Sequence, residues 1–240
     1  MPIKYNEKYI TQVGDFKSVL TTATHIFFEH AEDGDVGQYT NVRAYAFEGV
    51  EGYKGYTLTG IYLPNTITHF YDYAFCYLNS LKNLSENAIN GEHTLPNSLE
   101  EIGPYACRGI SLKLTSLSNC EHLTKIKENG MSNSGDDITF SSLPNALTYI
   151  GYAALANLRK INIQSTKNVI EIGSYGFYTS STSTTNLVLE EALTTIGDKA
   201  FHGFGQKNNL TVTNKTNIDN INQYFTNIIT ETYVIGGEQQ

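Results

Sequence analysis

The chain has 240 residues, of which 40% are hydrophobic, and a formal net charge of -8 at pH 7. This hydrophobic fraction is sufficient for a buried core and excludes intrinsic disorder as the default interpretation. Lysine and arginine never cluster in more than two neighbours, as at Arg159 and Lys160, so the basic stripe that nucleic-acid binding requires is missing. No apolar run reaches the roughly 18 residues of a membrane helix, and we predict no membrane insertion.

The two ends of the chain lack the pattern that fills its centre, and both are predicted to be caps. Residues 1–38 form the expected N-terminal cap, in which Phe16 to Phe28 is predicted to be a short helix followed by a strand. Residues 226–240 form the expected C-terminal cap strand and tail. A repeat protein needs such atypical ends because its terminal repeats otherwise expose their apolar edges.

Residues 39–225 repeat one pattern, L-P-x-x-L-x-x-I-G-x-x-A-F. Its best copies begin at Leu63, Leu95, Leu143 and Leu189, and the last of them lacks the proline. When weaker copies are included, the second apolar position falls at 42, 70, 84, 102, 126, 150, 172, 196 and 221. The mean period of about 22 residues lies in the range of about 20–29 that is typical of leucine-rich repeats. We therefore predict one domain with about nine irregular repeats.

The repeated residues have distinct physical roles in a stacked coil. The L-x-x-I and A-F pairs are the expected inward positions, because each turn of a solenoid has one buried face. Alanine is expected where neighbouring backbones run close together, and proline ends the preceding strand. The glycine after the isoleucine is expected to permit a sharp bend at positive φ.

Short segments that alternate apolar, variable and apolar residues flank the repeats, and we predict that they are strands with one buried face. They are Ile61 to Leu63, Leu112 to Leu114, Ile138 to Phe140, Ile161 to Ile163, Leu187 to Leu189 and Leu210 to Val212. Stacked in parallel, these strands are expected to make one continuous sheet. The predicted fold is therefore a mainly β leucine-rich-repeat solenoid, with a parallel β-sheet on one face and short turns or short helices on the other.

This pattern resembles the signature of the BspA-like leucine-rich repeat family, which is close to I-P-x-x-V-x-x-I-G-x-x-A-F-x-x-C. The resemblance covers about residues 39–225 and is most specific in the best copies. The chain departs from the signature where Ile89, Cys107 and Leu155 replace the phenylalanine. The resemblance implies a curved solenoid of strands and short turns without enzyme activity. It also implies a surface or secreted protein that adheres to host or bacterial partners.

No constellation of residues in the sequence indicates catalysis, a metal or a cofactor. The histidines are scattered over different repeats, without the close spacing of a metal site. The acidic loops at Asp33 to Asp35 and Asp136 to Asp137 do not match a calcium-binding loop, which favours solvated loops. Cys76, Cys107 and Cys120 are an odd set without C-x-x-C spacing, which favours buried thiols over a zinc site or a disulfide framework. We predict a protein that is not an enzyme.

Two surfaces are candidates for binding a partner. The first is a row of tyrosines, each directly before the alanine position of its unit: Tyr45, Tyr73, Tyr105 and Tyr175. Such a row forms either an ordinary intramolecular ladder or an exposed surface that stacks on sugar rings or on a partner protein. The second surface is the outward side of the predicted strands, with residues such as Tyr62, Lys113, Thr139 and Asn162. Its mixed chemistry suits protein recognition better than a small ligand.

Three functions remain open at this point. The first is a non-catalytic interaction or adhesion module that binds a host or bacterial surface protein. The second is a carbohydrate-binding solenoid that uses the tyrosine row, and the third is a structural component of a larger, phage-encoded assembly. The resemblance implies a cell-surface or secreted location, although Met1 to Glu7 lack the apolar stretch of a signal peptide.

Overall fold

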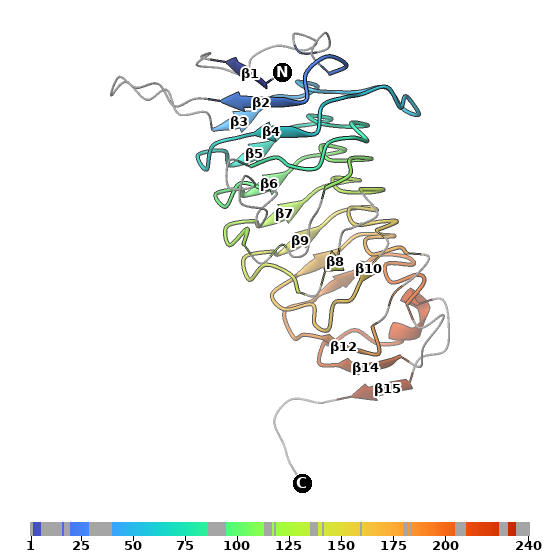
Figure 1. Ribbon diagram of the computed structural model, residues 1–240. Helices are drawn as coiled ribbons and strands as arrows, with labels where there is room; N and C mark the ends of the chain where they lie inside the picture. The colour runs from blue at the N-terminus through green and yellow to red at the C-terminus, as the bar shows by residue number, and fades with distance from the viewer. Residues whose placement is uncertain are drawn as a thin grey trace.

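A computed structural model describes most of the chain as one stack of parallel coils. The described residues are 2–5, 16, 20–28, 40–85, 95–112, 117, 119–134, 139–140, 142–158, 160–179, 182, 184–204, 210–225 and 230–233. Figure 1 shows each coil, which is one turn of the solenoid, lying on the next from strand β1 at one end to β15 at the other. The predicted solenoid fold with a parallel sheet is confirmed, and all strand pairs between its named strands are parallel.

One sheet of seven parallel strands runs along the stack. Its strands follow one another in chain order and are two residues long: β3 (Asn41–Val42), β5 (His69–Phe70), β6 (Glu101–Ile102), β7 (Lys125–Ile126), β9 (Tyr149–Ile150), β11 (Glu171–Ile172) and β13 (Thr195–Ile196). The second residue of every strand is buried. The final apolar position of the L-x-x-I pair therefore builds one column of the core.

The other strands form three shorter sheets, so the single continuous sheet predicted from the flanking segments is wrong. The first contains β1 (Pro2–Tyr5), β2 (His25–Phe28) and β4 (Gly60–Tyr62); the second, β8 (Thr139–Phe140) and β10 (Lys160–Ile161); the third, β12 (Asn186–Leu189), β14 (Thr211–Asn214) and β15 (Thr230–Tyr233). Equivalent positions in neighbouring coils are 22 to 32 residues apart. Consecutive turns of the solenoid therefore differ in length.

Two of the predicted repeats do not form separate rungs of the main sheet. Leu84 is buried, but its neighbour Asn83 forms a parallel bridge to Gly60, so this segment lies in line with β4 in the next coil and not in the main sheet. Ile221 begins the 3-10 helix η2 (Ile221–Tyr224). The seven strands of the main sheet are separated by six turns, and the count of about nine repeats is corrected accordingly.

The turn after each strand is also bound to the next coil through its backbone. Alternate amides of this turn donate to the following coil, as in Tyr73 to Pro104 at 2.9 Å, Phe75 to Ala106 at 2.8 Å and Tyr77 to Arg108 at 2.7 Å. The same three bonds recur in other coils. Because these bonds satisfy polar groups that the close stacking would otherwise bury unpaired, the coils adhere on this side without a regular β-strand.

The glycine that follows the isoleucine has a different role from the predicted one. Its φ is not positive in any of Gly103, Gly151, Gly173 and Gly197. Instead, a Cβ at these positions would lie between 2.2 and 2.8 Å from backbone atoms of the preceding coil. Positive φ values occur two residues later, in a column that the residues Tyr45, Tyr73, Tyr105, Asn129, Ala153, Tyr175 and Lys199 occupy.

The aromatic position of the A-F pair builds a second buried column. Its members are fully or almost fully buried: Phe47, Phe75, Cys107, Met131, Leu155, Phe177 and Phe201. Where phenylalanines are neighbours they stack, with ring centroids 5.5 Å apart in both Phe47–Phe75 and Phe177–Phe201. The predicted inward positions are confirmed.

The boundaries of the caps stay predictions. Residues 1, 6–15, 17–19 and 29–38 in the first cap, and 226–229 and 234–240 in the last, lie outside the described residues. Strand β1 pairs with β2, and β2 pairs with β4, so described parts of the first cap lie against the repeats. In the described part of the chain, no helix is long and apolar enough to cross a bilayer.

Candidate binding surface

Three of the predicted tyrosines form a stacked ladder on the side of the solenoid. The ring centroids of Tyr45 and Tyr73 are 5.2 Å apart with an interplanar angle of 10°, and those of Tyr73 and Tyr105 are 4.7 Å apart with an angle of 4°. Tyr45 is 37% exposed, and the other two are half-buried. We call these three residues the tyrosine ladder.

The backbone fixes the position of each ring in the ladder. All three tyrosines are in the left-handed region, with φ between 56° and 61°, which costs a residue with a side chain about 1–2 kcal/mol. Each is held there because its amide donates to the next coil, to the carbonyl oxygens of Asp72, Pro104 and Glu128 respectively, at 2.9 Å. The rings are therefore ordered before any partner arrives.

The fourth predicted tyrosine is not part of this ladder. The same left-handed column continues with Asn129 and Ala153 before it reaches Tyr175, so two coils without a ring separate it from Tyr105. Tyr175 instead packs edge-on against Tyr152 and Tyr178, with both centroid distances 5.9 Å. The predicted row is thus two separate aromatic groups.

Charged residues lie at the Tyr105 end of the ladder. The hydroxyl of Tyr105 donates to Oε1 of Glu128 at 2.8 Å, and this hydrogen bond, followed by burial, raises the pKa of Tyr105. The guanidinium carbon of Arg108 lies 5.5 Å from the ring centroid of Tyr105 and 5.6 Å from that of Tyr77. The ladder therefore ends in a cation that lies over aromatic rings and an anion that is bound to a tyrosine hydroxyl.

Beyond Glu128 the surface continues toward the main sheet. A hollow of about 290 Å³ is lined by Pro104, Lys125, Lys127, Glu128 and Tyr149. Nζ of Lys127 pairs with Oε1 of Glu101 at 2.7 Å. Because both charged groups are partly exposed, this ion pair contributes little to stability, but it gives the strand face a mixed charge pattern beside the ladder.

The residues of the second predicted surface do not come together. Tyr62 in β4 is half-buried and stacks on His25 at 5.7 Å, and burial raises its pKa. Asn162 accepts a hydrogen bond from the hydroxyl of Thr184 at 3.5 Å, on another part of the stack. Thr139 belongs to β8, in a separate sheet from β4, and Lys113 lies outside the described residues.

Arg108, Glu128 and Tyr77 were not predicted as site residues from the sequence. None of them occupies a recurring position of the L-P-x-x-L-x-x-I-G-x-x-A-F pattern, and Tyr105 and Glu128 are 23 residues apart. The available signal was the stacking itself, because residues at equal places in neighbouring coils lie side by side. Arg108 and Tyr77 hold neighbouring places, three and four residues after their own ladder tyrosines.

The described residues contain no group of three or more histidine, cysteine or acidic side chains arranged for a metal ion. Cys76, Cys107 and Cys120 are free and buried. Burial raises the pKa of Cys76 and of Cys120 to about 12 and also raises that of Cys107. A nucleophilic thiol needs a lowered pKa and access to solvent, so these thiols are core residues.

We expect none of the three cysteines to react with a thiol reagent in the folded protein. At about pH 8 an ordinary exposed cysteine is partly ionised, whereas these groups are neutral and shielded. Ellman's reagent should titrate close to zero thiols in buffer and all of them in concentrated guanidinium chloride. A rapidly reacting thiol in native protein would contradict the buried placement.

The stacked coils, with their L-x-x-I and A-F core and a lateral ladder but no catalytic cluster among the described residues, define a leucine-rich repeat solenoid. The family described as BspA type Leucine rich repeat region matches residues 37–136 and 124–235 in 6 copies. The chain belongs to this family. Repeats of this kind are consistent with a protein-interaction or surface module.

Two crystal structures are similar to this chain. One is a leucine rich cell surface protein from Faecalibacterium prausnitzii A2-165, with 19% identity, a TM-score of 0.49, and coverage of 82% of this chain and 50% of that one. The other is a leucine-rich repeat protein from Bacteroides ovatus ATCC 8483, with 17% identity, a TM-score of 0.42, and coverage of 82% and 58%. The chain spans about half the length of each protein. No match is found among curated proteins.

Proposed function

We propose that this chain is a non-catalytic interaction module that binds a protein on a host or bacterial surface. The observation that carries the proposal is the tyrosine ladder, with Arg108 and Glu128 at its end. Tyrosine and arginine are enriched among the residues that dominate binding energy at protein interfaces. Rings that are already ordered also lose little conformational entropy on binding.

The geometry of the ladder favours a protein over a carbohydrate partner. Sugars stack on the open face of an aromatic ring, but here the faces of Tyr73 are covered by Tyr45 and Tyr105 at angles of 10° and 4°. The ladder therefore presents ring edges and hydroxyl groups, which suit the mixed apolar and polar surface of a protein. The family resemblance supports a cell-surface or secreted location for such a module.

The test is a variant that removes the rings but keeps the backbone. Asn129 occupies the same left-handed column with φ 52°, so the triple variant Tyr45→Asn, Tyr73→Asn and Tyr105→Asn should fold. Because two ring stacks are lost while asparagine tolerates this φ better, we expect stability to change by only about 1 kcal/mol. Binding to immobilised collagen, laminin or fibronectin, measured by biolayer interferometry, should weaken at least tenfold for the protein that the wild type binds.

Tyr152→Asn is the matched control, because Tyr152 is 49% exposed but lies outside the ladder. It should bind as the wild type does. Equal binding by the triple variant and the wild type would refute the ladder as the interface. Tight binding to neutral glycans that the triple variant loses, with none to the proteins, would favour the carbohydrate alternative instead.

A further inference from the structure

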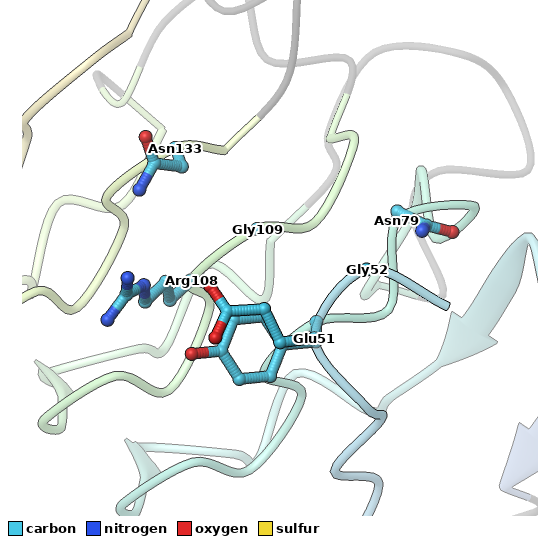
Figure 2. Close-up of a pocket in the computed structure, with 7 residues that line it drawn as sticks. Glu51, Gly52, Asn79, Arg108, Gly109 and Asn133 are labelled. Atoms are coloured by element: carbon cyan, nitrogen blue, oxygen red, sulfur yellow. The ribbon is translucent and has the colours of Figure 1, made fainter. Parts of the chain in front are cut away.

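A hollow next to the ladder has a chemistry of its own. It measures about 390 Å³ and is lined by residues of four successive coils: Glu51, Gly52, Tyr77, Asn79, Arg108, Gly109 and Asn133. In Figure 2, Arg108 and Asn133 lie on one side of it and Asn79 on the other. This volume is near the lower end of the range of about 300–1,000 Å³ for small-ligand sites.

The hollow exists because one place in a column has no side chain. Tyr77, Gly109 and Asn133 occupy equal places in three neighbouring coils, all with positive φ, at 64°, 71° and 54°. A Cβ on Gly109 would lie 3.4 Å from Cδ1 of Tyr77. The missing side chain leaves open space between a phenol and a carboxamide, with Arg108 directly beside it.

Arg108 is a cation whose side-chain hydrogen-bond donors have no partner among the residues that the structure describes. Within the described part of the chain, no carboxylate forms an ion pair with it, whereas Lys127 and Lys215 pair with Glu101 and Glu190. Its guanidinium lies over the rings of Tyr77 and Tyr105. A guanidinium that aromatic rings hold in place, with its planar fork of donors free, is well suited to bind a carboxylate.

The rest of the lining favours a ligand that carries hydroxyl groups, and not a second negative charge, besides the carboxylate that binds Arg108. Glu51 contributes a carboxylate to the same lining, and this negative charge would repel a ligand that is purely anionic. Asn133 is exposed and contributes an amide that both donates and accepts. A ligand that carries one carboxylate and several hydroxyl groups satisfies Arg108, Glu51 and Asn133 together.

We propose that this hollow binds an acidic sugar residue, such as a uronic or sialic acid, with its carboxylate on Arg108 and its hydroxyl groups toward Glu51 and Asn133. The site shares Arg108 with the surface proposed above for a protein, but it lies apart from Tyr45 and Tyr73 of the ladder, and a sugar can bind there without the protein partner. The hollow would thus bind a chemical class of ligand, acidic sugars, that the tyrosine ladder alone does not bind.

Isothermal titration calorimetry with free glucuronic acid and free N-acetylneuraminic acid tests the site. At least one should bind, and glucose, the uncharged match of glucuronic acid, should bind at least tenfold more weakly. Arg108→Gln should weaken acidic-sugar binding at least tenfold, because a charge-assisted fork is lost. Asn133→Asp keeps a residue that tolerates positive φ but adds a negative charge, and it should weaken binding as well.

Lys167→Gln is the control for loss of a positive charge, because Lys167 lines a different hollow. The affinity of this variant for the acidic sugar should equal that of the wild type. The double variant Tyr45→Asn, Tyr73→Asn should also keep acidic-sugar binding, which separates this site from the protein interface. The proposal is overturned if neither acidic sugar binds, if glucose binds equally well, or if folded Arg108→Gln binds like the wild type. It also fails if a triglutamate peptide binds and the sugars do not.

Discussion

Replacing Gly197 with alanine is expected to unfold the C-terminal coils of the solenoid. The added Cβ would lie 2.2 Å from the backbone nitrogen of Ser174 and 2.6 Å from the carbonyl carbon of Gly173. Backbone atoms cannot move aside as the end of a flexible side chain does, so the coils must separate locally. This separation would disrupt the 2.7 Å bond from the Gly197 amide to the carbonyl of Ile172. We expect a loss of more than about 3 kcal/mol.

Urea unfolding followed by circular dichroism measures this loss, and hydrogen exchange locates it in the coils after β11. Gly52→Ala is the matched control, because Gly52 has a φ of 78° and its new Cβ would meet no atom within 4 Å beyond the adjoining residues. Its cost should be only the left-handed penalty of about 1–2 kcal/mol. If Gly197→Ala is no more destabilising than Gly52→Ala, the inference that backbone contact between the coils requires glycine at position 197 is wrong.

Phe75→Ala is expected to destabilise the aromatic column strongly. The ring of Phe75 is fully buried, stacks on Phe47 at 5.5 Å and meets the edge of Phe70 at 5.0 Å. Truncation leaves a cavity between three coils that the hydrogen-bonded backbones on either side cannot close. Substitutions of this kind cost about 3–5 kcal/mol, which is a large part of the stability of an ordinary domain.

Phe75→Leu separates volume from aromaticity, because Leu155 and Met131 fill the same column in other coils. We expect it to cost about 1–2 kcal/mol, since most of the volume is kept and only the ring contacts are lost. Both variants are compared by urea unfolding at equal protein concentration. Equal destabilisation by leucine and alanine would show that ring stacking, and not filled volume, dominates this column.

The periodic part of the fold was predictable because burial repeats with the coil. Ile102, Ile126 and Ile150 each end a short strand and are fully buried, as the spacing of apolar residues indicated. A pattern of this kind records which side chains face inward. It does not record which stretch of a coil pairs with its neighbour, so the main sheet was assigned to the wrong segments.

Prediction from the sequence also failed for glycine, because glycine can be required either for a positive φ or for close contact between backbones. Glycine after the isoleucine suggested positive φ, but at Gly173 the requirement is the nearness of the Gly151 backbone, 2.7 Å from a Cβ. Only the stacked neighbour shows which use applies. Similarly, Leu84 fits the apolar spacing and is buried, yet it belongs to a coil that already has its rung in β5.

The candidate site was predictable only in its repeated members. Tyr45, Tyr73 and Tyr105 share a position in the motif, so their alignment followed from the repeat. Arg108 approaches Tyr77 from the next coil, and the hollow beside them depends on a single glycine in a column of larger residues. Such singular features carry no periodic signal, and they appear only when equal places in successive coils are compared in space.

The layered backbone bonding gives the solenoid a mechanical character. Strands β1 and β15 lie at opposite ends of the stack (Figure 1), and each coil is tied to the next mainly by backbone bonds that run along its long axis. When the two ends of the chain are pulled apart, we expect the coils to separate one after another, because the hydrogen bonds between two coils break before those of the next pair are loaded. A released coil of 24 residues, such as the one between Glu100 and Thr124, would add about 80 Å of extended chain, so the molecule yields by stepwise lengthening and not by abrupt rupture.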